Sequence, residues 1–387
     1  MTLHQSWFAR DARGWTCEPP DGAAAAFHRR LPGYAATPLA EAPGLAAELG
    51  VGRLFVKDES ARFDLRAFKF LGASWAGFRA VAARTGYAGP AALSELQAHL
   101  REGETAGGDA DLALVTATDG NHGRAVARTA RLLGLPARVY LPKVAPDVVI
   151  DRISAEGARI TVVDADYDGA VLAAQSDADS ASGGLLIQDT AWTGYEEVPA
   201  WIVDGYETLF AEIDAQLFAA GVSAVDLVSV QVGVGSLAQA TVAHYRSSAL
   251  PASARPRLLS VEPDTAACLL RSLADDALVP VPTNGTVMNG LDCGTPSSLA
   301  WPYLRAGLDA AIAVTDDEAR EAIADLTTAG IPAGPSGAAG FAGLRAALTG
   351  PNAAARRHDL GLGLDDGGDS RPVVVCICTE GPLTDDH

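Results

Sequence analysis

The sequence predicts an α/β fold in which helices cover both faces of a parallel sheet. Short apolar segments alternate along the chain with segments of helical periodicity, and glycine or proline separates many of them. Parallel strands buried on both faces have this continuous apolar character. The chain has 387 residues, of which 48% are apolar and 20% charged, so it is long enough for one large unit or two packed domains.

The strands are expected in a regular order, each bounded by a turn. Residues 112–117 run into the loop Thr118–Gly123, and a helical pattern follows that ends at Gly134. The next strand, 137–142, stops at a proline. The remaining strands are predicted at 157–165, 226–232, 256–263 and 371–381.

The net charge of −19 argues against binding to duplex nucleic acid or to an anionic membrane, because both would be repelled. A phosphate group would have to be held by local devices such as backbone N–H groups. No apolar run approaches the roughly 20 residues that span a bilayer. The N-terminal segment lacks the basic stretch and apolar region of a secretory signal, so a cytoplasmic protein is expected.

The cysteines and histidines do not indicate a metal site. Five cysteines, an odd number without a CxxC pair, are typical of reduced thiols in a cytoplasm. The seven histidines are scattered along the chain, and none pairs at the spacing of zinc ligands. We therefore expect no structural zinc and no other bound metal.

Lys69 lies between Phe68 and Phe70 in an otherwise apolar segment. Burial disfavours the charged form of a lysine and lowers its pKa, a property that a Schiff-base lysine needs. An amphipathic helix whose lysine reaches solvent would explain the segment too, and for an isolated lysine it is the more common case.

The loop Thr118–Gly123 connects a predicted strand to a predicted helix. Free N–H groups at a helix start form an anion site, and Gly120 and Gly123 would let a ligand carboxylate approach the backbone. Asp119 would also serve as a plain N-cap, the more common role of aspartate at such a position. A single histidine such as His122 is more often structural than catalytic.

A glycine-rich turn follows the strand that ends near Gln231. Such a turn binds phosphate through its N–H groups, and Ser236 would add a hydroxyl donor. Gly233, Gly235 and Ala238 also satisfy the dinucleotide pattern, with Glu262 near the place of a ribose-binding acid. A nicotinamide-dependent dehydrogenase that uses this turn is therefore the alternative from another class.

Cys376 and Cys378 lie two residues apart in the last predicted strand, so they share one face of it. Two buried small hydrophobes would give the same pattern, which is how free cysteine usually behaves.

Together and in this order, the motifs resemble those of the fold-type II pyridoxal-phosphate (PLP) enzymes, the group that includes serine and threonine dehydratases. In that group a lysine holds the cofactor as a Schiff base, one loop binds the substrate carboxylate and a glycine-rich loop binds the cofactor phosphate. The resemblance runs from about residue 34 to residue 385. The matching segments are Tyr34–Leu39, Ala67–Lys69, Gly120–Gly123, Gly233–Leu237 and the strand end at Cys378.

Within that group the chain resembles the diaminopropionate ammonia-lyase family. The resemblance implies a PLP-dependent lyase that converts 2,3-diaminopropionate, in one or both enantiomeric forms, to pyruvate and ammonia by α,β-elimination. A serine or threonine dehydratase, or another lyase that expels a β-substituent, is the alternative. The features behind this are Thr118–Arg124, Gln188–Tyr195, Val198–Ile202, Val261–Asp264, Met288–Gly294 and Thr379–Gly381.

The resemblance also implies roles for single residues. Lys69 would carry the Schiff base and remove the Cα proton from one face of the substrate, and Asp119 would serve the opposite face. Asp189 is expected as a second carboxylate near the substrate amine. A cationic β-ammonium group gives Asp119 a charge partner, which favours a diamino acid over serine. Cofactor contacts are expected from Lys69, Asn121, Gly233, Val234, Gly235, Ser236, Leu237 and Cys378, and substrate contacts from Asp119, Gly120, Asn121 and His122.

For the architecture, the resemblance implies two α/β domains with the cofactor in the cleft between them, and a homodimer. Residues 1–79 and 206–387 are expected to form a large cofactor-binding domain. Residues 80–205 are expected to form a small domain that carries the Asp119 loop.

Three departures from the family pattern lie near the expected cofactor. The segment Gly334–Gly337 has no acid where relatives usually carry a glutamate. Cys378 stands where serine is more common. Asp64 and Arg66 replace the small or amide residues expected before the lysine. The expelled group could therefore differ from an amine while the reaction remains a β-elimination.

Overall fold

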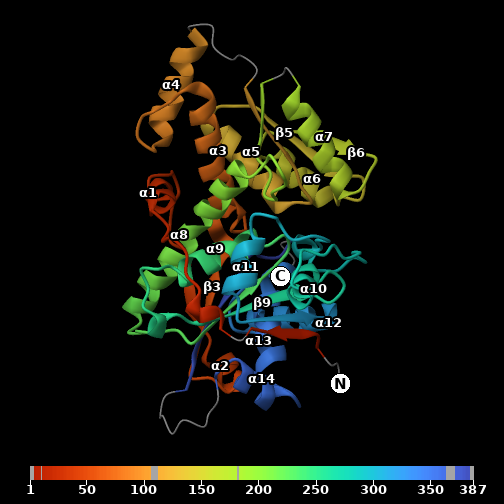
Figure 1. The fold of residues 1–387 in the computed structure, drawn as a ribbon. Helices are drawn as coiled ribbons and strands as arrows, with labels where there is room; N and C mark the ends of the chain where they lie inside the picture. Colours follow the sequence, from red (N-terminus) through yellow and green to blue (C-terminus); the bar gives the residue numbers. More distant parts are fainter. Residues whose placement is uncertain (1–3, 10, 106–111, 181–182, 363–370, 384–387) are drawn as a thin grey trace. The chain divides into compact units, whose positions relative to one another are not determined.

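The computed structural model describes residues 4–9, 11–105, 112–180, 183–362 and 371–383 (Figure 1). The chain forms two compact units. The first contains Met1–Pro20, Ala36–Ala61 and Leu209–His387, and the second contains Asp21–Ala35 and Arg62–Thr208. Lys69 falls in the second unit, whereas we expected it in the large domain. The expected division at residues 80 and 205 stays a prediction.

The first unit is built on a seven-stranded sheet of order β1-β10-β9-β8-β11-β3-β2. The five inner strands are parallel, and the two edge strands pair antiparallel to their neighbours. The strands are β1 (Ser6–Phe8), β2 (Leu39–Glu41), β3 (Arg53–Asp58), β8 (Leu227–Gln231), β9 (Arg257–Pro263), β10 (Ala310–Val314) and β11 (Val373–Cys378).

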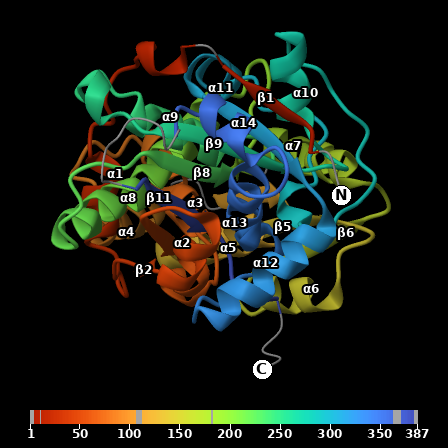
Figure 2. The same ribbon diagram turned by 90° about the horizontal axis from the view of Figure 1, so that it is seen from below.

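Helix α13 packs across the inner strands of this sheet and lies between α12 and α14 (Figure 2). Its side chains form one hydrophobic core with those of the inner strands, α2 and α12. The helical segments of the first unit are η1 (Ala12–Gly14), α2 (Pro43–Leu49), α9 (Ser236–Tyr245), η3 (Ala252–Ala254), α10 (Cys268–Asp275), η4 (Asn289–Leu291), α11 (Trp301–Gly307), α12 (Asp316–Thr328), α13 (Pro335–Leu348) and α14 (Ala353–Asp359).

The second unit contains a four-stranded parallel sheet of order β6-β5-β4-β7. Helices α5 and α7 both pack on β4 and β5, and α3 packs on α5. The elements are α1 (Ala23–His28), α3 (Lys69–Thr85), α4 (Leu93–Thr105), β4 (Ala113–Ala117), α5 (Asn121–Leu133), β5 (Ala137–Pro142), α6 (Asp147–Ser154), β6 (Arg159–Val163), α7 (Tyr167–Asp179) and β7 (Gly184–Leu186). Two segments continue across the boundary between the units, η2 (Glu59–Asp64) and α8 (Glu197–Ala219).

The α/β class is confirmed, and so are the six strand segments predicted above, to within a few residues. Helix α5 ends at Gly134 as predicted, because that glycine adopts a left-handed conformation with φ 77°. The sequence pattern missed β10, whose residues Ala310–Val314 are mostly alanine. Alanine favours helices in isolation, and burial between neighbouring strands overrides that preference here.

Two glycines allow α3 and α8 to approach closely within the second unit. A Cβ atom on Gly205 would lie 2.5 Å from the Leu71 carbonyl oxygen and 2.7 Å from Gly72 Cα. A Cβ on Gly72 would lie 2.7 Å from the ring of Tyr206. The start of α3, where Lys69 lies, is therefore packed directly against the Tyr206 turn of α8.

Within the described residues, no helix combines the length and the apolar character needed to cross a membrane. The same residues hold no cluster of three or more histidine, cysteine or acidic side chains suited to a metal ion.

Candidate active site

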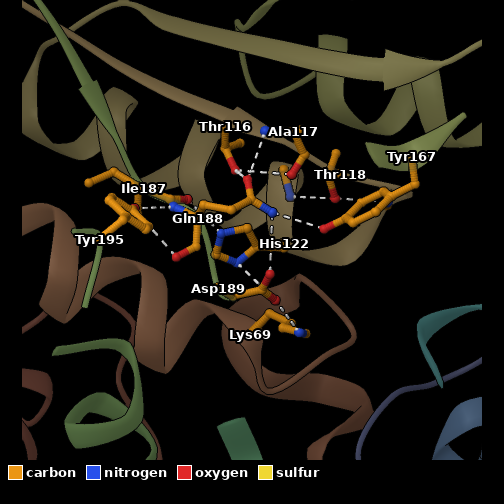
Figure 3. Close-up of polar contacts among 12 residues, drawn as sticks. Lys69, Thr116, Ala117, Thr118, His122, Tyr167, Ile187, Gln188, Asp189 and Tyr195 are labelled. Atoms are coloured by element: carbon orange, nitrogen blue, oxygen red, sulfur yellow. Dashed lines mark hydrogen bonds and ion pairs between the residues drawn. The ribbon is translucent and has the colours of Figure 1, made fainter. Parts of the chain in front are cut away.

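Lys69 is the first residue of α3, and its amine contacts a carboxylate from a distant part of the chain. Its Nζ donates a hydrogen bond to Asp189 Oδ2 at 2.5 Å (Figure 3). The Lys69 side chain is 22% exposed and that of Asp189 is 8% exposed. The contact joins residues 120 positions apart. Asp189 thus lies against the lysine itself.

The expectation that burial lowers the pKa of Lys69 is wrong for this structure. Burial is the largest single effect and lowers the pKa, but the charge and hydrogen bond of Asp189, together with contributions from Tyr206 and Asp119, outweigh it, and the pKa is raised. For Asp189, burial would raise the pKa, but His122, when it is protonated, and the Lys69 amine hold it well below its usual range. The two side chains therefore form an ion pair in which the amine is protonated.

His122 lies on the other side of Asp189. Its Nε2 donates to the Ile187 carbonyl oxygen at 2.7 Å, and its Nδ1 is 3.8 Å from Asp189 Oδ2. Burial lowers the pKa of His122, and the nearby Asp189 charge only partly opposes this. The imidazole is therefore neutral, with its proton on the nitrogen that faces Ile187.

Gly120 is the N-cap residue of helix α5, and Thr118, rather than Asp119, binds N–H groups at its start. The Thr118 hydroxyl accepts hydrogen bonds from the N–H groups of Gly120 at 2.9 Å and Gly123 at 3.0 Å. This capping role leaves Asp119 exposed in the loop, at a position from which its charge raises the pKa of Lys69. The capping interpretation of Asp119 is therefore replaced by one for Thr118, which sequence reasoning did not single out.

The two glycines of this loop differ in what surrounds them. A Cβ atom on Gly123 would lie 2.2 Å from Thr118 Cγ2, so this glycine is needed for helix capping rather than for a ligand. A Cβ on Gly120 would meet only Val149, at 3.8 Å, and the space beside Gly120 is open. Asn121 begins α5 and is half-buried. Room for a ligand next to the backbone is therefore found at Gly120.

Gln188, next to Asp189, fixes the backbone on which Asp189 sits. Its side-chain oxygen accepts from Thr116 Oγ1 and from the Ala117 N–H, both at 3.0 Å, and its amide donates to the Tyr167 hydroxyl at 2.9 Å. The Gln188 N–H donates to the Tyr195 hydroxyl at 2.8 Å (Figure 3). Tyr167 was not predicted from the sequence, because it is a single aromatic residue at a helix start.

Tyr206 is a further residue of this region that the sequence did not indicate. It is fully buried, and its ring packs on that of Phe68 with centroids 4.8 Å apart. Its hydroxyl has no hydrogen-bond partner among the described residues. Burial raises the pKa of Tyr206, so its hydroxyl is protonated.

The segment that leads into Lys69 has an unusual backbone. Phe63, Asp64 and Arg66 have φ angles of 50°, 58° and 61°, in the left-handed region. Each such residue costs roughly 1–2 kcal/mol relative to ordinary backbone. Asp64 and Arg66 are two of the departures noted in the sequence, at positions where an amide or a small side chain adopts this conformation more easily.

The glycine-rich turn of the first unit joins β8 to α9. Gly235 has φ 104°, and a Cβ on Gly233 would lie 2.8 Å from the Gly290 carbonyl oxygen. The Val234 carbonyl oxygen accepts from the Ser297 N–H at 2.8 Å. Ser236 and Leu237 form the first turn of α9, whose N–H groups have no partner inside the helix. This geometry suits a phosphate group.

Cys378 ends β11, the strand that pairs with β8, and its thiol is fully buried. Burial raises the pKa of the thiol, so it is protonated, and Sγ donates to the Glu380 carbonyl oxygen at 3.4 Å. The neighbouring turn lacks an acid of its own, but Glu380 Oε1 accepts from the Ser336 N–H there at 3.1 Å. An acid from another segment thus lies beside Gly334–Gly337.

Glu262, the acid of the dinucleotide alternative, has a different role in the structure. It is fully buried, and its two carboxylate oxygens accept from the N–H groups of Leu269 and Leu270, each at 2.7 Å. It caps the start of α10. A dinucleotide would need this acid for a ribose hydroxyl, so the structure disfavours the dehydrogenase alternative.

The structure therefore brings together two sets of predicted residues, each within one unit. Lys69, Asp119, His122 and Asp189 lie together in the second unit. Gly233–Leu237 and Cys378 lie at the carboxyl ends of two paired strands in the first unit, the edge at which ligands bind in such sheets.

Comparison with known proteins gives consistent matches. Residues 30–355 match the family model described as pyridoxal-phosphate dependent enzyme. A diaminopropionate ammonia-lyase of Salmonella typhimurium is 40% identical over 295 residues, which are 75% of this chain and 71% of that protein. The same enzyme of Escherichia coli is 34% identical over 369 residues, 93% of this chain and 88% of that protein. A crystal structure of the Escherichia coli enzyme matches this chain with a TM-score of 0.83 and 32% identity, over 98% of this chain and 95% of that chain. That structure was determined in complex with an aminoacrylate-PLP azomethine reaction intermediate.

Proposed function

Because this chain belongs to the family of pyridoxal-phosphate-dependent enzymes, among the diaminopropionate ammonia-lyases, we propose that it removes both amino groups of 2,3-diaminopropionate. The products are pyruvate and two molecules of ammonia, and one molecule of water is consumed. The substrate is a small amino acid with a second amino group on its β-carbon.

The observation that carries this proposal is the pair of carboxylates around one lysine amine. Asp189 contacts the Lys69 amine at 2.5 Å, and the charge of Asp119 also acts on it. A β-ammonium group is cationic and suits a site with two carboxylates. The hydroxyl of serine or threonine is neutral and gains little from such charges, so the site favours a diamino acid.

The residues of both units fit the cofactor by their chemistry. Lys69 supplies the amine for a Schiff base, the turn Gly233–Leu237 supplies N–H groups and a hydroxyl for the phosphate, and Cys378 supplies a thiol for the pyridine nitrogen. We assign Asn121 to the cofactor as well. Pyridoxal phosphate, when bound, supplies the electron sink that makes the Cα proton of an amino acid acidic.

The residues of this chain then divide the proton transfers. Lys69 takes the Cα proton from one face of the substrate, and Asp119 takes it from the opposite face, so both enantiomers are accepted. Asp189 holds the proton of the lysine amine when the amine is not reacting. The loop residues Gly120, Asn121 and His122 bind the substrate carboxylate at the start of α5.

Product stoichiometry tests this function. The purified protein with PLP should release pyruvate from D- or L-diaminopropionate together with ammonia in a ratio of two ammonia to one pyruvate. Serine would give one ammonia per pyruvate, and threonine would give a different keto acid. A protein that turns over serine or threonine but not diaminopropionate would be a dehydratase, and the proposal would be wrong.

The role of Lys69 is tested separately. Lys69→Ala should lose the visible absorption band of the bound cofactor and all activity, because no other residue replaces the amine. Lys143→Ala, at an exposed lysine in the same unit, is the control and should retain both. Borohydride reduction of the wild-type protein should attach the cofactor to the peptide that contains Lys69.

We further propose that the two units correspond to the two domains of this family. The protein is expected to act as a homodimer in the cytoplasm. The odd number of cysteines without a CxxC pair supports a reducing compartment. Light scattering on the purified protein should give twice the chain mass of 39.8 kDa.

A further inference from the structure

We propose that Arg124, Arg128 and Glu156 position Lys69 for the reaction by holding the carbonyl groups of the strained segment Phe63–Arg66. None of the three side chains touches the Lys69 amine in the structure, so they are positioning residues. The inference rests on the proposed function only in taking Lys69 as the catalytic amine.

The backbone of the strained segment must be stabilised by contacts from outside the segment. Phe63, Asp64 and Arg66 all have positive φ angles, and none of them is glycine. Such a backbone persists only when surrounding contacts fix it. The segment lies three to six residues before Lys69, so a relaxation of its backbone would move the start of α3 and the lysine with it.

Two arginines of α5 supply these contacts. Arg124 donates to the Leu65 carbonyl oxygen at 3.2 Å and to the Asp64 carbonyl oxygen at 3.4 Å. Arg128, one turn further along α5, donates to the Phe63 carbonyl oxygen at 3.4 Å. Three consecutive carbonyl groups of the strained segment are thus bound by one helix.

Glu156 fixes the two arginines. It is 4% exposed, and its carboxylate accepts from Arg128 Nε at 2.6 Å and from Arg128 Nη2 at 2.8 Å, the two-point geometry of a strong arginine–carboxylate pair. It also lies 3.5 Å from Arg124 Nε. Burial would raise the pKa of Glu156, but the surrounding arginines lower it, so the carboxylate is charged.

The same helix begins with the loop that carries Asp119. Helix α5 starts at Asn121, two residues after Asp119, so the Asp119 loop joins directly onto the helix that carries the two arginines. The arginine contacts therefore connect the backbone before Lys69 to the element that presents Asp119. Loss of these contacts would change the spacing between the two proposed bases, and a shift of about 1 Å is enough to reduce a rate by up to a hundredfold.

The variant that tests this is Glu156→Gln, with Arg128→Lys as a second variant that keeps the charge but loses the planar fork. Both should lower kcat for diaminopropionate by about tenfold or more while KM stays within about twofold. Hydrogen exchange of the holoenzyme should be faster in peptides that cover residues 62–68. The Leu65 N–H, which donates to the Arg62 carbonyl oxygen at 2.9 Å, is a reporter within that segment.

Arg131→Ala is the matched control. Arg131 is on the same helix, is half-exposed and lies 3.1 Å from the same Glu156 carboxylate. Among the described residues, it makes no hydrogen bond to the strained segment. Its loss should leave kcat and the exchange of residues 62–68 unchanged. The inference is overturned if exchange in Glu156→Gln and Arg128→Lys equals that of wild type, or if Arg131→Ala changes it equally. Exchange needs no substrate, so this result is independent of whether wild type acts on diaminopropionate.

Discussion

At the scale of single residues, the state of the Lys69 amine depends on Asp189. The ion pair between them keeps the amine protonated, and a protonated amine cannot attack an aldehyde. The lysine therefore reacts only after the proton has moved, and Asp189 is the group that contacts it most closely.

Replacing Asp189 should shift the pH at which Lys69 reacts. Asp189 raises the pKa of Lys69, so Asp189→Asn should lower it and increase the neutral fraction of the amine at any given pH. The rate at which the cofactor-free protein captures added PLP should rise with pH in both proteins, with a lower midpoint in the variant. An unchanged or higher midpoint would show that Asp189 does not control the amine.

Replacing Asp119 should separate the two enantiomers. Asp119→Asn removes the proposed base on one face of the substrate and leaves the Lys69–Asp189 contact intact. We expect a loss of about a hundredfold or more in kcat on one enantiomer of diaminopropionate and a much smaller loss on the other. The check is pyruvate release from each pure enantiomer. Equal losses on both would refute the assignment of the two faces.

At the scale of elements, the contact between α3 and α8 positions Lys69. Gly72 and Gly205 permit the two helix backbones to approach closely, and this brings the ring of Tyr206 against Phe68. The close approach requires glycine because a Cβ at either position would overlap backbone or ring atoms. The helix crossing is therefore a condition for the geometry around Lys69.

Gly205→Ala should consequently damage both stability and activity. The added Cβ would lie 2.5 Å from a backbone oxygen, which cannot turn away as a side chain can. We expect a destabilisation of about 1–3 kcal/mol, measured by urea unfolding, and a lower kcat. Gly44→Ala is the control: Gly44 lies in helix α2 with nothing near its Cβ direction, so alanine there should be neutral or stabilising.

At the scale of the whole molecule, the sheet of the first unit is completed by segments from distant parts of the sequence. In the first unit, β3 from the N-terminal half lies beside β11 from the C-terminus. Glu262, near the end of β9, is a buried acid. Its carboxyl oxygens accept hydrogen bonds from N–H groups within the first unit. Such buried acids influence the stability of the fold as pH changes.

Glu262 predicts one pH dependence of the free energy of unfolding. Burial raises its pKa to about 8 from an ordinary value of 4.5. The stability it contributes is fully present below pH 4.5 and is lost as pH rises through 8, by at most about 1.4 kcal/mol per pH unit. Glu262→Gln should make the curve between pH 5.5 and about 8 flatter, as urea unfolding can measure, whereas the exposed Glu321→Gln should not. A parallel curve for Glu262→Gln would contradict this.

Lys69, Asp119 and Gly233–Leu237 stand out only because several motifs occur together, in an order that resembles a known family. The sequence by itself determined the α/β class and six of the strand segments. These could be predicted because burial of a strand and the glycine of a turn leave a local pattern in neighbouring residues. The alanine-rich β10 escaped prediction for the same reason, since its local pattern favours a helix.

Only the tertiary structure decided which residues meet. The Lys69–Asp189 ion pair and the contacts of Arg124 and Arg128 join segments whose spacing in the sequence carries no signal. The direction of the Lys69 pKa shift is an example: the apolar neighbours of the lysine predict a decrease, and a carboxylate 120 residues away makes the largest contribution that opposes it. The physical reason is that electrostatic interactions depend on distance in space, which the order of the strands and the packing of the helices set.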